Sequence, residues 1–329
     1  MSDRHLGSPG LLVAAAITIA LIGTSALGQP THNTRDLQGI WVSNSATPLE
    51  RPKALEGRAR LTEKEVAELK QRADRIFKEQ NSDYSGGDAV FLAALGDLDR
   101  YKSPNATAGS ADMIERTFDG RTSLIVDPPD GKVPALTPAG QERARAFAAS
   151  RVRPDPADPE GVSSDRRCLT FGMPRLGGNY GAGPYSYYQI VQTPDYVVVT
   201  MEFIHEARII PLDGRPHLPP AIGQWNGDSR GRWEGNTLVV DTTNFSPKTH
   251  FMGSAGHLHL VERFTRIGAD RIDYQLTLDD PATWTRAWTA LIHLQRTDEK
   301  VYEVACHEGN YYTMQGVLAG ARSAEKRRN

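Results

Sequence analysis

Two histidines and a glutamate stand close together in the stretch His257-Leu-His259-Leu-Val-Glu262-Arg263. Residues two apart in a strand share a face, so His257, His259 and Arg263 are expected on one face and Glu262 on the other. Histidine titrates near neutral pH, which suits general acid/base catalysis. We therefore expect His259 to move protons, with Glu262 as one candidate to orient it. A metal site at His257 and His259 is the alternative, although the acidic residue lies on the wrong face for the usual pattern, and no bound metal is expected.

A second polar cluster, Glu202-Phe-Ile-His205-Glu-Ala-Arg208, follows an apolar stretch at positions 196–200. Charged groups beside apolar residues are costly to bury unless they are paired. The cluster is therefore expected at the mouth of a barrel or in ion pairs. We expect His205 to be a second proton-transfer group and Glu202 to orient it. Arg208, with Arg263, is expected to stabilise negative charge that develops on a substrate.

Three further residues are expected to contact a substrate. His217 lies between prolines, and a rigid loop of this kind often positions binding residues; solvent exposure is the alternative. Tyr185 and Trp225 belong to a set of aromatic residues that suits an apolar pocket, with core packing as the alternative. No phosphate loop, nucleophile elbow, flavin or pyridoxal motif is present, so no cofactor is expected.

The chain turns decisively to β-structure from position 187 onward. Segments with strand composition are separated by short turns, and positions 271–278 alternate apolar and polar residues as in a half-buried strand. The segments lie at 187–192, 195–203, 207–211, 231–233, 237–241, 258–265, 271–278, 288–294 and 300–306. Their number predicts an antiparallel, lipocalin-like β-barrel of about 8–10 strands.

The first half of the chain has a different pattern. A capping box at Thr62 and Glu65 begins a helix over 62–78, and Thr137-Pro138 begins another over 137–150. A hairpin is expected at 113–118 and 122–126, around Asp119-Gly120. We expect residues 29–160 to form a strand and helix region, with its two helices outside the barrel, and 161–329 to form the barrel, in one continuous unit.

The N-terminus has the composition of a cleaved secretory signal, residues 1–28, and no later segment is apolar enough to span a membrane. A periplasmic or secreted protein is expected. In such an oxidising compartment the pair Cys168 and Cys306 is expected to form a disulfide, with a nucleophilic cysteine as the alternative. The 38 basic and 40 acidic residues nearly balance, which argues against nucleic-acid binding.

Ten motifs are spread along the chain, at residues 36–41, 127–131, 136–140, 167–168, 172–175, 190–195, 213–217, 227–241, 261–263 and 306–308. They resemble those of a family of exported proteins, mostly of unassigned function, that is abundant in acidobacteria and some proteobacteria. The resemblance covers nearly the whole mature chain and implies one extended unit, but it implies no activity. Gly39-Ile-Trp41 and the number of strands carry a weaker resemblance, to lipocalin-like barrels.

Together these features predict a cofactor-independent acid/base enzyme of the lyase, isomerase or hydratase type. Its substrate is expected to be a small hydrophobic or aromatic molecule in a barrel pocket. A lipocalin-like periplasmic carrier with the same pocket and a histidine-dependent metalloenzyme are the alternatives.

Overall fold

The structure is a computed structural model that describes residues 33–76, 87–96, 116–152, 162–170, 172–173, 187–202, 204, 206–303 and 305–327. The expected signal peptide and two expected site residues, Tyr185 and His205, lie outside these ranges. Within them, no helix combines the length and the apolar character needed to cross a membrane.

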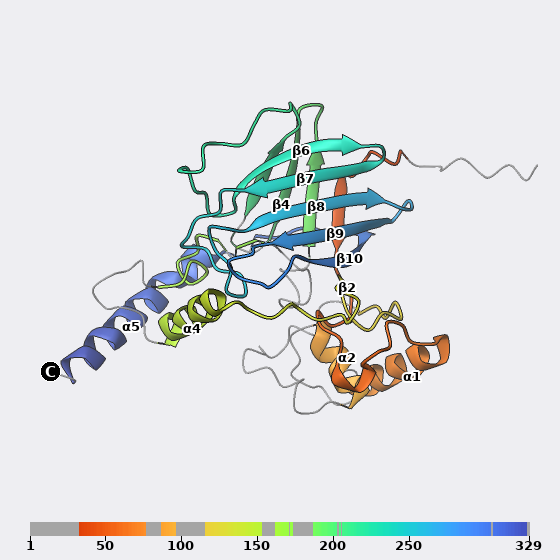
Figure 1. Ribbon diagram of the computed structural model, residues 1–329, viewed down its shortest axis with the longest axis horizontal. Helices are drawn as coiled ribbons and strands as arrows, with labels where there is room; N and C mark the ends of the chain where they lie inside the picture. Colours follow the sequence, from red (N-terminus) through yellow and green to blue (C-terminus); the bar gives the residue numbers. More distant parts are fainter. Residues whose placement is uncertain are drawn as a thin grey trace, which may run out of the picture. The chain divides into compact units, whose positions relative to one another are not determined.

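Ten strands form one antiparallel sheet, so the prediction of a mainly β fold with about 8–10 strands is confirmed (Figure 1). Its strand order is β5-β4-β3-β1-β10-β9-β8-β7-β6, and β2 pairs with β10 beside this path. The strands are β1 (Gly39–Val42), β2 (Ile125–Asp127), β3 (Tyr187–Gln192), β4 (Tyr196–Met201), β5 (Ala207–Pro211), β6 (Asp228–Glu234), β7 (Thr237–Thr243), β8 (His259–Arg266), β9 (Arg271–Asp279) and β10 (Trp288–Thr297).

The two ends of this path, β5 and β6, run in the same direction. Every neighbouring pair along the path is antiparallel, and the path holds an odd number of strands. No backbone ladder joins β5 to β6 in the described part of the chain, so the sheet is not closed there as the predicted barrel requires. Side chains of the two strands nevertheless meet, for example Arg208 Nη2 and Ser229 Oγ at 3.1 Å. We call this meeting of β5 and β6 the seam.

Alternation along the strands creates the main core. In β8 and β9 every second side chain is buried, which confirms the half-buried pattern expected for positions 271–278. Apolar side chains from all parts of the sheet pack together on this inner face, with Trp41, Trp284 and Trp288 among the largest that are fully buried. The other face carries most of the partly exposed polar residues of these strands.

The helices lie outside the strand path. The capping box at Thr62 is present and begins α1 (Glu63–Asp74), and α4 (Pro138–Val152) matches the second predicted helix. A helix that the sequence did not predict, α2 (Gly87–Leu95), packs against α1 in a small separate core with Leu55, Leu69 and Phe91. A short 3-10 helix, η1 (Lys53–Leu55), precedes them.

Two expected strand elements are wrong. Cys306 begins a 21-residue helix, α5 (Cys306–Lys326), and residues 300–303 and 305, the described residues before it, form no strand. The hairpin around Asp119-Gly120 does not form within the described residues 116–126, because Thr117 bridges to Ser45 and β2 pairs with β10 instead. At the expected hairpin, partners from distant parts of the chain thus replace the local turn.

The disulfide between Cys168 and Cys306 is confirmed, with the two Cα atoms 5.8 Å apart. It joins the segment 162–170 to the first residue of α5 rather than to a last strand. Asn310 in the first turns of α5 adds a hydrogen bond from Nδ2 to the carbonyl oxygen of Arg166, at 2.6 Å. The start of α5 is thus held by a covalent link and a polar contact to the same segment.

The seam generates a testable prediction at Gly231. A Cβ atom there would lie 2.6 Å from Leu212 Cδ2 and 2.9 Å from Ile210 Cγ2, closer than side-chain carbons pack. We expect Gly231→Ala to lower the free energy of unfolding by about 1–3 kcal/mol, the usual cost of overpacking. Gly268→Ala is the control, because its nearest atom, Arg271 Cβ, would be 4.0 Å away. Equal stability of the two variants in urea denaturation would show that β5 and β6 do not pack closely.

Candidate functional site

A buried ion pair crosses the inner side of the seam. Arg208 on β5 donates from Nη1 to Glu262 Oε1 at 3.0 Å and from Nη2 to Glu262 Oε2 at 2.6 Å. Arg208 is 6 % exposed and Glu262, on β8, is fully buried. Tyr274 on β9 donates its hydroxyl to Glu262 Oε1 at 2.5 Å. The carboxylate therefore has hydrogen-bond donors from two sides, which is what a buried charge requires.

The ionised pair is maintained by mutual attraction. Burial acts to lower the pKa of Arg208, but the charge and hydrogen bonds of Glu262 outweigh it and raise that pKa above its ordinary value. Burial, and then the negative charge of Glu262, raise the pKa of Tyr274 well above its ordinary value. Tyr274 therefore stays a neutral donor at physiological pH, and Arg208 stays charged.

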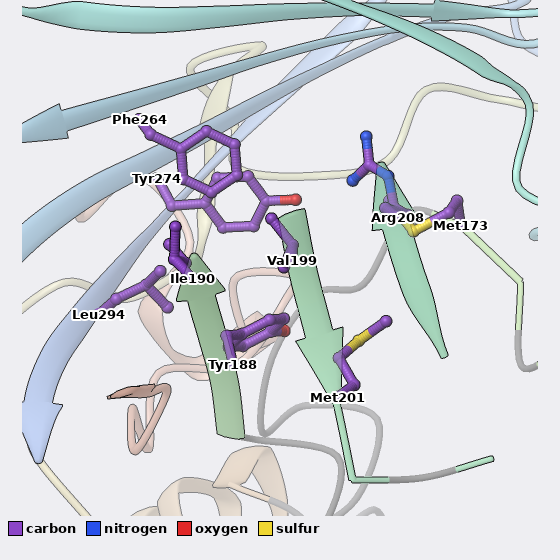
Figure 2. A pocket seen from close by; sticks show the side chains of 9 residues that line it. All are labelled: Met173, Tyr188, Ile190, Val199, Met201, Arg208, Phe264, Tyr274 and Leu294. Carbon is purple, nitrogen blue, oxygen red and sulfur yellow. The ribbon is translucent and has the colours of Figure 1, made fainter. Parts of the chain in front are cut away.

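The inner face leaves little empty space beside this pair. Figure 2 shows the nine side chains around the cavity there, among them Tyr188, Met201, Arg208, Phe264 and Tyr274. The cavity volume is about 10 Å³, which is about enough for one water molecule. This cavity, as formed by the nine described side chains, is therefore too small for the aromatic molecule that we expected in a barrel pocket.

A much larger groove lies on the outer side of the seam. Its volume is about 770 Å³, and its walls come from β5, the first half of β6 and residues 223–227 before β6, with Ser246 and Lys248. We call it the outer groove. Arg208 lines both the inner cavity and this groove. Its Nε is buried without a hydrogen-bond partner among the described residues, whereas such groups are normally paired.

Four side chains form a continuous hydrogen-bonded chain beside the groove, which we call the histidine chain. Asp228 lines the groove, and its Oδ2 lies 3.1 Å from His217 Nδ1. His217 Nε2 lies 2.8 Å from Asp241 Oδ1, and the other oxygen of Asp241 lies 2.9 Å from His259 Nε2. Ionised carboxylates only accept hydrogen bonds, so both contacts of His217 are hydrogen bonds when its ring carries two protons.

Strand register explains why these groups meet. Arg230 on β6 pairs with Asp241 on β7, so Asp228, two residues earlier, shares the outer face with them. Asp241 pairs with Val261 on β8, which places His259 diagonally next to it on that face. His217 comes from the connection between β5 and β6, and Asp228 also accepts a hydrogen bond from the backbone N–H of Leu218 at 2.9 Å.

The charges of the histidine chain stabilise one another. The hydrogen bond from His259 lowers the pKa of Asp241, assisted by the hydrogen bond from His217, although partial burial opposes this. The hydrogen bond to Asp241 raises the pKa of His259, again against partial burial. Asp228 is held in place by Arg230, whose Nη1 lies 2.6 Å from Asp228 Oδ1. In the histidine chain, carboxylates and imidazoles thus alternate from the groove to the surface.

The other expected site residues are spread over the molecule. Glu262 and His259 lie on opposite faces of β8, as the alternation predicted, so they do not contact each other. Glu202 accepts a hydrogen bond from the backbone N–H of Tyr302 at 2.8 Å, away from Arg208. Arg263 shares the outer face with His259 but binds Glu234 at 2.8 Å.

Two more of the expected site residues, Trp225 and His257, lie in connections between strands. Trp225 lines the outer groove, and its ring lies 5.7 Å from the guanidinium of Arg167. His257 is exposed in the turn before β8 rather than on a strand face with His259. The part of the chain that the structure describes contains no group of three or more His, Cys, Asp or Glu residues able to hold a metal ion.

Sequence reasoning missed Asp228 and Asp241 as members of the site. Asp228 directly follows Gly227, whose φ of 69° is typical of a turn, and Asp241 is six residues after Gly235, another glycine with an evident role in a turn. The available signal was alternation: Asp241 interrupts an apolar run at an outward position of β7. Their partner His217 comes from a proline-rich connection without periodicity, so its contacts could not be derived.

The buried pair generates a second prediction. Glu262→Gln leaves the charge of Arg208 buried without its partner, so we expect the free energy of unfolding to fall by about 3–5 kcal/mol. Tyr274→Phe removes only one hydrogen bond to the carboxylate and should cost about 2 kcal/mol. The double variant Arg208→Met/Glu262→Leu should recover most of the loss. Urea denaturation measures all three, and a Glu262→Gln cost no larger than that of Tyr274→Phe would contradict a buried ion pair.

His259 generates a prediction about pH. Its raised pKa means that contact with Asp241 stabilises the fold fully below the ordinary histidine pKa of about 6.5, and that this contribution is lost as pH rises through the folded value. We expect the stability difference between wild type and His259→Gln to be larger at pH 5.5 than at pH 9. The change should stay below about 1 kcal/mol because the side chain of His259 is 44 % exposed. His257→Gln is the matched control, and a difference that grows with pH would contradict the contact.

Comparison with known proteins gives no relative from which a role could be transferred: no family model, curated protein or solved structure matches the chain. The contacts of the outer groove and the histidine chain therefore carry the functional assignment.

Proposed function

We propose that the protein is an acid/base enzyme of the lyase, isomerase or hydratase type that acts on a small molecule in the outer groove. The observation that carries this proposal is the histidine chain, because it connects a carboxylate in the groove wall, Asp228, through His217 and Asp241 to the half-exposed His259. Such a series of groups can take a proton from a bound molecule and pass it to solvent.

In the proposed reaction, Asp228 accepts a proton from a carbon next to a carbonyl group of the substrate. The electron pair of the broken C–H bond remains on the substrate as an enolate. Arg230 and Arg208 also line the groove, and their positive charges would stabilise the oxygen of that enolate. Return of the proton to a different carbon gives isomerisation, and loss of a leaving group from the neighbouring carbon gives elimination.

His217 acts in this proposal as the positioning and relay group. In the neutral ring with its proton on Nε2, Nδ1 can accept the proton that Asp228 has taken from the substrate, while Nε2–H donates to Asp241. Asp241 orients the ring from the other nitrogen, in the way that a carboxylate orients a catalytic imidazole. His259 contributes at the solvent end, which keeps the proton-transfer role that the sequence indicated for it.

A carrier that binds the same molecule without chemistry is the second candidate. The volume of the outer groove falls within the range of small-molecule sites, about 300–1,000 Å³, and this holds with or without a reaction. For this carrier we propose a lipocalin-like arrangement in which the sheet curves around its core without a β5–β6 ladder among the described residues, supported by the ion pair from β5 to β8.

We also propose that the protein works in the periplasm or outside the cell after cleavage of residues 1–28. The disulfide between Cys168 and Cys306 supports this location, because such bonds persist mainly in oxidising compartments. The resemblance to exported proteins of unassigned function agrees with it.

The proposed reaction is tested by deuterium exchange. The mature protein is incubated in D₂O with a panel of carbonyl compounds, and NMR follows the loss of the C–H signal next to the carbonyl group. We expect exchange on a subset of compounds, slowed about 100-fold or more by His217→Gln or Asp228→Asn, because general acid/base groups contribute about 10²–10⁴ in rate.

Thermal unfolding of each variant shows whether it is folded. His257→Gln is the control, because His257 is not a member of the histidine chain. Binding of panel compounds without any exchange would favour the carrier. Exchange that survives both substitutions would refute the role of the histidine chain.

A further inference from the structure

Apolar side chains are aligned across three strands on the outer face beside the groove. Val191 on β3 pairs with Val198 on β4, and Val198 pairs with Ile209 on β5. Val191 is 39 % exposed and Ile209 is 64 % exposed, and Tyr196 on the same face of β4 is 36 % exposed. Single exposed apolar residues are common, but a row in register across adjacent strands marks a surface that contacts something apolar.

This row continues directly into the outer groove. Ile209 belongs both to the row and to the groove wall, together with its neighbours Ala207 and Pro211 on β5. Apart from Arg208, the side chains of the β5 wall are therefore apolar. We call the row and this wall together the apolar wall.

The opposite wall has the reverse character. It contains the cationic donors Arg230 and Lys248 and the side-chain amide of Gln224, whereas Asn226 Nδ2 donates to Glu206 Oε1 at 2.8 Å. Donors of this kind complement carboxylate or carbonyl oxygens. Asp228 lies on the same polar side, so a carbon next to such an oxygen would be close to the carboxylate of the histidine chain.

The size of the site favours a small molecule over a protein partner. The groove volume of about 770 Å³ falls within the range of small-molecule sites, about 300–1,000 Å³. A stable protein interface buries about 800 Å² on each partner. A row of four side chains covers far less than that area. The apolar wall is thus suited to one alkyl chain or ring.

We infer that the outer groove binds small amphipathic carbonyl compounds, of which medium-chain carboxylates are the simplest. The apolar part lies along Ile209, Val198 and Val191, and the oxygen-bearing head lies toward Arg230 and Lys248. This inference names the substrate class of the proposed enzyme and rests on the same groove.

Calorimetric titration of the mature protein with octanoate, butyrate and octylamine tests the inference. We expect octanoate to bind at least about 10-fold more tightly than butyrate, because only the longer chain reaches the apolar wall. It should also bind at least about 10-fold more tightly than octylamine, whose head cannot accept hydrogen bonds from the polar wall. Similar affinities for octanoate and octylamine, or for octanoate and butyrate, would overturn the inference.

Two variants locate the binding. Ile209→Ser should weaken octanoate about 5-fold or more and leave butyrate unchanged, whereas Lys248→Gln should weaken both carboxylates. Ile267→Ser is the matched control, because Ile267 is 50 % exposed and lies between β8 and β9, outside the groove lining. An equal loss of octanoate affinity in Ile209→Ser and Ile267→Ser would place binding elsewhere and refute the inference.

The outcomes separate this inference from the proposed reaction. Octanoate binding that depends on Ile209, without deuterium exchange on any carbonyl compound, would refute only the enzyme. Exchange that needs His217 but shows no preference for longer chains would refute only the amphipathic substrate.

Discussion

The ion pair between Arg208 and Glu262 is the contact on which the shape of the sheet depends. Backbone hydrogen bonds join all neighbouring strands along the path. Its two end strands, β5 and β6, share no such ladder in the described residues. The guanidinium of Arg208 on β5 instead binds Glu262 on β8. It also donates hydrogen bonds to Ser229 on β6 and Thr242 on β7. A buried pair of this kind adds little net stability relative to an apolar core, but it penalises any arrangement that separates its partners. It therefore specifies how the two ends of the sheet meet.

The strands beside the seam present different chemistry on their two faces, because successive side chains of a strand point to opposite faces. On β8, Glu262 points to the core, while His259 and Arg263 point outward. Desolvation and ion pairing dominate the inner face, where Tyr274 is kept neutral. Hydrogen bonding in partial contact with solvent dominates the outer face, where the charges of His259 and Asp241 stabilise each other. The inner network fixes the strands that carry the outer one.

Local patterns in the sequence predicted much of the fold. The alternation of β9, the capping box of α1 and the cysteine pair each depend on neighbours in the chain or on an oxidising environment, and all three are confirmed. The failures have the opposite cause. Residues 300–306 were assigned to a strand on local composition, but the sheet is complete without them and Cys306 begins a helix. The residues around Asp119 find distant partners rather than each other.

The candidate site was only partly predictable for the same reason. His259 was identified from its residue type and spacing, but its partner Asp241 depends on the register between β7 and β8. His217 was assigned to a rigid loop, yet the sequence contains no indication that this loop crosses over Asp228 and Asp241. Contacts of this kind are set by the order of strands in the sheet, which a single sequence does not encode in its local periodicity.

Topology also explains why the groove and the histidine chain lie together. Two strands that run in the same direction cannot be joined by a tight turn, so the chain needs a long connection from β5 to β6. Residues 212–227 make that connection, and they supply both Trp225 in the groove wall and His217 in the histidine chain. An even number of strands in the path would permit a short hairpin at this point and would remove both residues. The odd strand count therefore makes β5 and β6 parallel and requires the long connection that supplies Trp225 and His217.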